Sequence, residues 1–202
     1  MRAGLWPFRV GFGMFAAALI VGLAAAGVAA VALAVPRLRT GSVLILIAAF
    51  LLGAASAAVP LEHVRRVKTL PYINDVTTDP ENPPQYSQAR PYEAHFAELQ
   101  RIGYPQLRPL ELAMAPAQAF ARARAAAQAL GWEIVGADDK AGRIEAVATT
   151  RWFGFKDDIA VRVASVGSGS RVDVRSRSRV GRSDLGANAK RIQEFLTEIR
   201  TR

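Results

Sequence analysis

The residues with the clearest chemical potential are arginines near the end of the chain. Within residues 171–180 every second position is an arginine, except for Asp173. Alternate residues of a β-strand point to the same side, about 7 Å apart. An extended segment would therefore present a row of guanidinium groups, which bind phosphates and carboxylates through paired N–H donors. The row consists of Arg171, Arg175, Arg177 and Arg179.

Two explanations of this row are open. It could bind phosphates or lipid headgroups, with Arg175, Arg177 and Arg179 as the contact residues. It could instead be a solvated sheet face whose arginines pair with carboxylates across neighbouring strands. The candidate carboxylate partners are Glu145, Asp157, Asp158 and Asp173.

Residues 152–158, with the sequence Trp-Phe-Gly-Phe-Lys-Asp-Asp, place three aromatic and three charged side chains in a short turn. Trp152 and Phe155 could form a partner-binding tip or dip into a membrane surface. Aromatic residues that fill the core beside a charged turn explain the segment equally well. Asp157 and Asp158 are adjacent, and adjacent residues of a strand point in opposite directions, which argues against a paired-carboxylate catalytic site.

The segment 179–186 carries two arginines and two glycines before an expected helix at Leu185. Arg182 and the helix N-terminus could hold an anion there. The segment lacks the G-x-x-x-x-G-K-[ST] pattern of a phosphate loop. Capping of the helix by Ser183 or Asp184 is the simpler explanation.

No catalytic, metal-binding or cofactor-binding constellation is visible. The chain has no cysteine and two histidines, so thiol catalysis, disulfides and thiolate metal sites are excluded. Neither G-x-S-x-G nor H-E-x-x-H occurs. We therefore predict no catalytic residue, no metal and no cofactor. A hydrolase-type enzyme with an unrecognised site near Asp157, Asp158 and Arg182 stays open as an alternative.

The elements that would position these residues form an α+β domain. Apolar residues at helical spacing predict helices over 116–130 and from 185 onward. Alternating patterns between turn signals predict the strands. We expect an antiparallel four- to five-stranded sheet, covered on one face by two helices and open on the arginine face. The expected strands are 107–112, 132–136, 143–153, 158–166 and 171–180.

A proline-rich segment precedes this domain. Prolines at 71, 80, 83 and 84 favour an extended backbone. Tyr72, Ile73 and Val76 would be buried as the segment lies against the domain, and a short helix would follow over 92–102. We expect three parts, which are a transmembrane helical hairpin over 1–60, a strap with its short helix over 61–106, and the α+β domain over 107–202.

The hairpin is predicted from two apolar runs, 10–35 and 43–59. A bilayer core of about 30 Å needs roughly 17–25 apolar helical residues, and both runs suffice. Small residues recur at every fourth position, a spacing that lets helices in lipid pack closely. They are Ala18, Gly22, Ala26, Ala30 and Ala34 in the first run, and Ala49, Gly53 and Ala57 in the second.

Charge gives a divided picture of location and partners. The loop between the runs carries Arg37 and Arg39, whereas more basic residues flank the outer ends, so the positive-inside rule favours a cytoplasmic domain.

Four of the 26 basic residues and none of the 17 acidic ones precede Pro60. The remainder is thus only moderately basic. The arginine row lacks interleaved aromatic residues, which argues against nucleic acid as a partner.

Four blocks of the chain, at 71–84, 131–135, 150–158 and 170–186, resemble the bacterial domain-of-unknown-function family 1499. The resemblance covers residues 70–200. Residues 4–12 are also similar to the segment before the helices of longer, membrane-anchored members. The resemblance implies no established activity, and it implies association with the cell envelope. It also implies a cytoplasmic loop between the helices, hence a periplasmic domain, against the charge count.

Our hypothesis is a non-enzymatic protein of the inner (plasma) membrane that binds an anionic lipid, an envelope component or a protein partner. Its contact surface would be the sheet face with Arg175, Arg177 and Arg179, extended by Arg182. The hydrolase is the first alternative. A cytoplasmic nucleic-acid binder is the second, and it requires the opposite topology.

Overall fold

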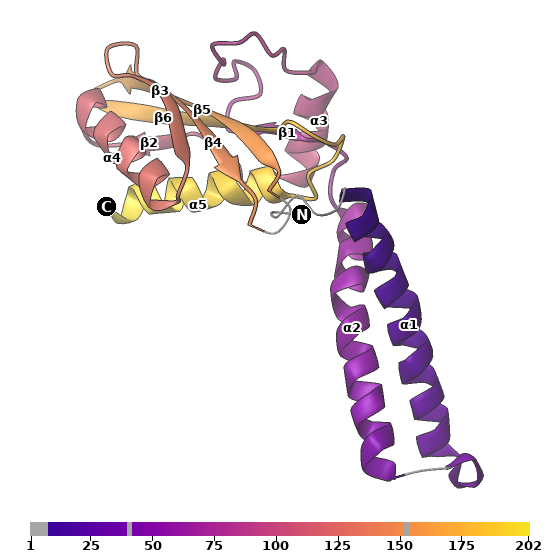
Figure 1. The fold of residues 1–202 in the computed structure, drawn as a ribbon. Helices are drawn as coiled ribbons and strands as arrows, with labels where there is room; N and C mark the ends of the chain where they lie inside the picture. The colour runs from indigo at the N-terminus through magenta and orange to yellow at the C-terminus, as the bar shows by residue number, and fades with distance from the viewer. Residues whose placement is uncertain (1–7, 40–41, 152–153) are drawn as a thin grey trace. The chain divides into compact units, whose positions relative to one another are not determined.

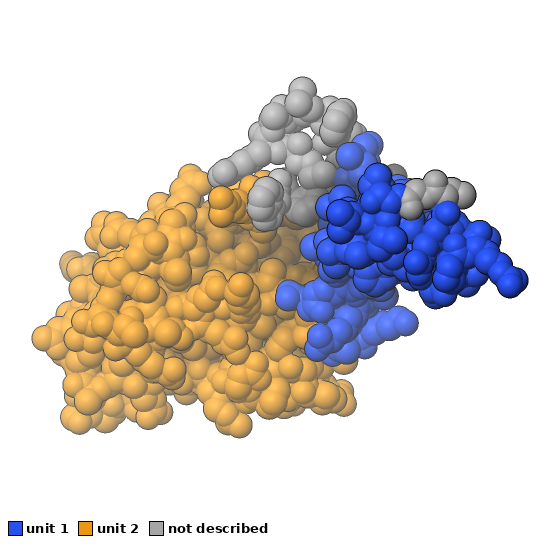
Figure 2. Space-filling view, turned by 90° about the horizontal axis from the view of Figure 1, so that it is seen from below, with its two compact units in different colours: residues 1–69 blue, residues 70–202 orange. Residues whose placement is uncertain are grey.

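The computed structural model describes residues 8–39, 42–151 and 154–202 of the chain. It divides into two compact units, Met1–Thr69 and Leu70–Arg202. Figure 2 shows the first unit in blue and the second in orange. The strap and the strands belong to the same compact unit.

The first unit is a helical hairpin. Its helices are α1 (Phe8–Ala34) and α2 (Val43–Thr69), joined through the short 3₁₀ helix η1 (Pro36–Leu38). They lie side by side (Figure 1), and both are long and apolar enough to cross a membrane. The loop arginine Arg39 donates hydrogen bonds to the carbonyls of Ala32 and Leu33, which satisfies backbone acceptors that the end of α1 leaves free. The predicted pair of apolar helices is confirmed.

Small residues form the contact between these helices. A Cβ added at Gly22 would lie 2.8 Å from the carbonyl oxygen of Gly53, and one added at Gly53 would lie 2.7 Å from that of Gly22. The backbones therefore touch as the spacing predicted, although Ala18 and Ala34 are exposed. Because an α-helix has 3.6 residues per turn, residues spaced four apart do not stay on the same side of the helix. The side of α1 that contacts α2 therefore includes Ala29, which is outside the four-residue series. Buried small residues of the two helices include Gly22, Ala26, Ala29, Gly53 and Ala57.

Helix α2 continues beyond its apolar run. It contains Pro60 and ends at Thr69, whereas we expected the hairpin to end at residue 60. Glu62 pairs with Arg65 and Arg66 at helical spacing, and such pairs favour the helix. The last two turns of α2 are therefore polar.

The second unit is an α+β domain, as predicted. Its six-stranded antiparallel sheet has the order β1-β6-β5-β4-β3, and β2 also pairs with β6. The sixth strand is β1, which comes from the strap. The strands are β1 (Asp75–Thr77), β2 (Leu110–Leu112), β3 (Glu133–Asp138), β4 (Arg143–Thr149), β5 (Lys156–Val166) and β6 (Gly169–Ser178). The helices are α3 (Ala94–Gly103), α4 (Pro116–Ala129) and α5 (Ala187–Thr201).

The main core lies between the sheet and helices α4 and α5. Helix α5 runs along one face of the sheet (Figure 1). The ring of Trp132 stacks on that of Phe195, with 4.8 Å between centroids. The apolar residues that alternate along β4, β5 and β6 meet the apolar stripe of α5, which confirms the face assignment. Representative buried members are Ile144, Ile159, Val161, Val174, Ile192 and Ile199.

The second face of the sheet is not open, contrary to expectation. After pairing with β6 as strand β1, the strap crosses this face through residues 78–91. Tyr86 donates a hydrogen bond from its hydroxyl to the carbonyl of Asp158, and the backbone N–H of Ser87 donates to Glu145. Ile73 and Val76 are buried as predicted, but Tyr72 is 62 % exposed. Sequence pattern alone did not indicate that the strap would cover polar residues of the sheet.

Candidate functional site

The strand register arranges the charged residues of the second face in rows. In one row, Glu145 of β4 lies opposite Ala160 of β5, which lies opposite Arg175 of β6. In the next row, Val147 lies opposite Asp158, which lies opposite Arg177. The predicted row of arginines is therefore present on one face, and the strap determines which of them remain accessible.

Arg175 is part of a buried ion pair. Its Nε and one terminal nitrogen donate to the two oxygens of Asp75 at 3.0 and 2.7 Å. The two side chains are 0 % and 1 % exposed. The guanidinium carbon lies 4.9 Å from the ring centroid of Tyr86 and 5.4 Å from that of Tyr92, within cation–π range. Burial raises the pKa of the Asp75 carboxyl, and the hydrogen bonds and charge of Arg175 oppose this rise.

These contacts give Arg175 a structural role. A buried guanidinium needs a hydrogen-bonded counter-charge, and Asp75 supplies it from the strap. The carbonyls of Pro84 and Arg90 accept further hydrogen bonds from Arg175. Arg175 was predicted to contact a ligand on an open sheet face. Its guanidinium is instead buried and holds the strap against β6.

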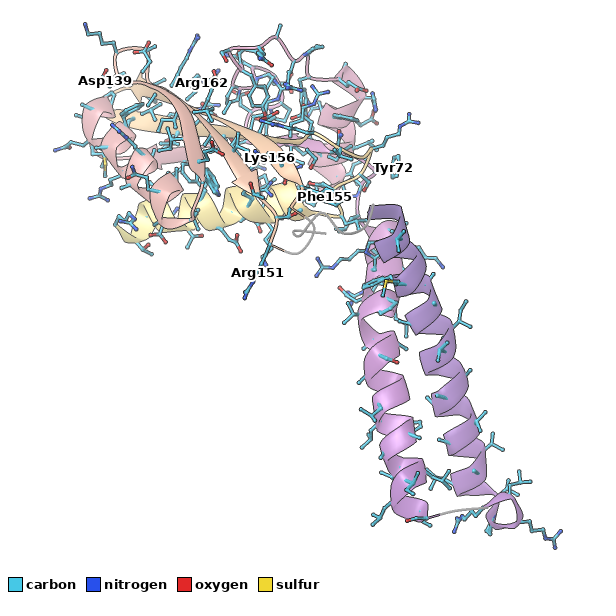
Figure 3. The ribbon with its side chains drawn as sticks, viewed as in Figure 1. Tyr72, Asp139, Arg151, Phe155, Lys156 and Arg162 are labelled. Carbon is cyan, nitrogen blue, oxygen red and sulfur yellow. The ribbon has the colours of Figure 1, made fainter. Side chains whose placement is uncertain are left out.

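A second network holds the strap at Asp79, shortly after Asp75. Arg162 and Arg171 both contact Asp79 of the strap and Asp173 of β6, with N–O distances of 2.8–3.0 Å. Asp173 is 1 % exposed. Arg162 is labelled on β5 in Figure 3. For Arg171 and Arg175, pairing with carboxylates is thus the correct explanation, although most of these carboxylates come from the strap.

Two arginines contact Asp158 and a third lies opposite it in the strand register. We call these residues, Arg90, Arg177 and Arg179, the arginine cluster. Arg179 donates two hydrogen bonds to Oδ1 of Asp158, at 2.9 and 2.6 Å. Arg90 lies 3.5 Å from Oδ2, and Arg177 faces Asp158 in register. The hydrogen bonds to Asp158 raise the pKa of Arg179.

The arginine cluster has more positive charge than its carboxylate neutralises. Its members have side chains that are 34 %, 27 % and 41 % exposed. Arg177 also lies 3.9 Å from Asp75, but that carboxylate already carries the two short hydrogen bonds of Arg175. Guanidinium donors are therefore left for an anion from solution.

A cleft of about 220 Å³ adjoins the arginine cluster. The strap forms one wall, β4 and β5 form the floor, and Val135 lies at its rim, where a bulge interrupts the pairing of β3 with β4. The residues whose side chains give the cleft its chemistry are Tyr86, Ser87, Arg90, Glu145, Asp158 and Arg179.

Glu145 is the second carboxylate of this cleft. Its Oε1 accepts the backbone N–H of Ser87 at 2.7 Å, and its Oε2 accepts the Ser87 hydroxyl at 2.9 Å. No arginine or lysine within the described parts of the chain forms an ion pair with Glu145. The cleft is thus lined by two arginines, by Asp158, which they contact, and by a second carboxylate that has no arginine or lysine partner among the described residues.

Asp157 and Asp158 lie on opposite faces of the sheet. Asp157 is 2.5 Å from a terminal nitrogen of Arg191 on α5, and its side chain is 3 % exposed. Asp158 points instead toward the strap, so the two carboxylates do not form a common site, as the alternation indicated. Arg182 is exposed in the loop before α5.

The remaining candidates lie in the β4–β5 turn and in the loop before α5. Trp152 lies outside the described residues. Phe155 is half-buried, and its backbone exchanges hydrogen bonds with Thr150 that close the turn. Asp184 accepts the N–H groups of Gly186 and Asn188, so its carboxylate binds a free N–H of the first turn of α5. The N-cap residue itself is Gly186, and the helix begins at Ala187, not at Leu185 as expected. Burial raises the pKa of the Asp184 carboxyl against these two hydrogen bonds.

Sequence reasoning found Arg177, Arg179 and Asp158 but missed Arg90 and the role of Ser87. Both missed residues belong to the strap, which has no periodic pattern to show which side chains meet the sheet. The only available signal was the number of prolines, which indicated an ordered, extended segment.

The fold and the cleft define a class of protein, in which a hairpin of two apolar helices is followed in the chain by an α+β domain whose sheet is crossed by a strap. A family model described as "Protein of unknown function (DUF1499)" matches residues 75–199. The match covers more than half of the chain, and the protein therefore belongs to this family, as its sequence blocks indicated.

Further comparisons add little. The comparison with curated proteins gave no match. Among solved structures, the crystal structure of Ara h 8.0201 is similar at 10 % identity, over 47 % of this chain and 96 % of that one, with a TM-score of 0.25. These values are too low to support any transfer of fold or site.

Proposed function

We propose that this protein is a non-enzymatic binding module, held at the membrane of the cell envelope by its helical hairpin, and that its arginine cluster binds a phosphate-bearing envelope component. The two apolar helices support the membrane location. The resemblance noted above supports the envelope. A periplasmic position of the domain is part of the proposal, and a reporter fused at Arg202 tests it.

One observation carries the proposed binding site. Arg90 and Arg179 contact Asp158, Arg177 lies opposite it in the strand register, and all three side chains are partly exposed. Arg90 and Arg179 line a cleft of about 220 Å³. The other two arginines of the row, Arg171 and Arg175, are held by buried or half-buried carboxylates, so the site must be smaller than the whole row. Arginine is suited to phosphate because its planar N–H donors match two phosphate oxygens at once.

Titration calorimetry with ethyl phosphate tests this site. The full-length protein in a phosphate-free maltoside detergent is used at low salt, since screening weakens exposed charges. A hydrogen bond to a charged group contributes about 1.5–3 kcal/mol. We therefore expect Arg179→Ala, and likewise Arg90→Ala, to weaken binding at least about tenfold.

Arg124 provides the matched control, because it is exposed on α4 and lies outside the cluster. Arg124→Ala removes the same charge and should leave the affinity for ethyl phosphate unchanged. Equal losses in the Arg124, Arg90 and Arg179 variants would show general charge attraction and contradict the proposed site. The same conclusion would follow if no variant changed the affinity.

A further inference from the structure

We infer that the ligand of the cleft carries an ammonium group as well as a phosphate, as an amino-alcohol phosphate does. This inference rests on the proposed function, because the phosphate would bind the arginine cluster. It adds a second contact, in which Glu145 binds the ammonium. The shared chemistry is that of a zwitterionic lipid headgroup and of its free amino-alcohol phosphate.

Glu145 is prepared for a cationic ligand. Both of its oxygens accept hydrogen bonds from Ser87, at 2.7 and 2.9 Å, which fix the orientation of the carboxylate. A carboxylate has about four acceptor positions, so acceptor capacity remains on each oxygen. Within the described residues no basic side chain pairs with it, although two arginines line the same cleft. A fixed, unneutralised carboxylate favours a cation from outside.

The strand register places Glu145 close to the residue that the arginines contact. Ala160 lies directly opposite Glu145, and Asp158 is two residues before Ala160 on the same face. Such diagonal neighbours are about 7–8 Å apart. One small ligand can therefore contact Glu145 and the arginines beside Asp158 at the same time.

The size and walls of the cleft fit a headgroup. Its volume of about 220 Å³ is below the roughly 300–1,000 Å³ of sites for drug-sized ligands. Val135 and Val147 contribute apolar wall next to the charged groups. The cleft therefore accommodates a short carbon linker and leaves acyl chains outside.

Calorimetry on the full-length protein in maltoside detergent compares pairs of ligands in which one member carries an ammonium group and the other lacks it. Phosphoethanolamine is paired with ethyl phosphate, and glycerophosphoethanolamine with glycerophosphoglycerol. In at least one pair, we expect the ammonium compound to bind at least about tenfold more tightly. Tighter binding of the diester points to a lipid headgroup, and tighter binding of the monoester points to the free compound.

Glu145→Gln separates this inference from the proposed function. Glutamine keeps the size and an acceptor for Ser87 but removes the charge. We expect it to abolish the ammonium advantage while ethyl phosphate binds as before, and unfolding curves check that the variant is folded. Equal affinities within both pairs, or an advantage that persists in Glu145→Gln, would overturn the inference. Loss of all phosphate binding in Arg179→Ala would still support the arginine site.

Discussion

Asparagine in place of Asp75 tests whether the strap is held by the buried ion pair. The substitution removes the carboxylate but leaves Arg175, whose side chain is 0 % exposed, without a counter-charge. Breaking a buried pair by removing one partner costs about 3–5 kcal/mol. Two short hydrogen bonds and two aromatic rings surround this guanidinium, so little solvent can compensate. We therefore expect the unfolding free energy to fall by about 3–5 kcal/mol.

Urea unfolding of the full-length protein, followed by near-ultraviolet circular dichroism, measures this loss. The control is Glu81→Gln, which breaks the Arg101–Glu81 pair, whose side chains are 58 % and 75 % exposed. An exposed pair contributes at most about 1 kcal/mol. If Asp75→Asn costs no more than this control, the buried pair does not hold the strap.

Two further predictions concern the hairpin and the pH dependence of stability. Gly53→Val should disrupt the packing of α1 on α2, because its Cβ would lie 2.7 Å from the Gly22 carbonyl, whereas Gly27→Val meets no atom within 4 Å. Thermal unfolding in detergent should show a loss for Gly53→Val alone, and equal losses would refute the contact. Asp184 has a raised pKa, so its carboxyl binds a proton more tightly in the folded state. Its contribution is greatest below its ordinary pKa of 3.8 and is lost as pH rises through the raised value. The stability of the natural protein relative to Asp184→Asn should therefore fall as the pH rises above about 4, and a constant difference would contradict the assignment.

The helices and strands were predicted well, because apolar residues recur along each of them at the spacing typical of its secondary structure. Alternation in β4, β5 and β6 identified the two faces of the sheet, including the opposite directions of Asp157 and Asp158. Apolar length identified α1 and α2, and small residues identified Gly22 and Gly53 as their contact. These features depend on neighbours close in sequence.

The strap contacts could not be predicted in the same way. Asp75 and Arg175 are 100 residues apart, and nothing local to either residue indicates the other. Strand β1 has three residues, too few for alternation to be recognised, and Arg90 lies in an irregular segment. Tyr72 was expected to be buried together with Ile73, but only Ile73 is buried and Tyr72 is exposed. Tertiary pairing determined these positions.

The most direct test of the central claim is calorimetric titration of the full-length protein with phosphoethanolamine, in parallel with Arg179→Ala and Arg124→Ala. The arginine cluster predicts saturable binding that weakens at least about tenfold in Arg179→Ala and is unchanged in Arg124→Ala. No saturable binding, or binding that both variants retain equally, would contradict it.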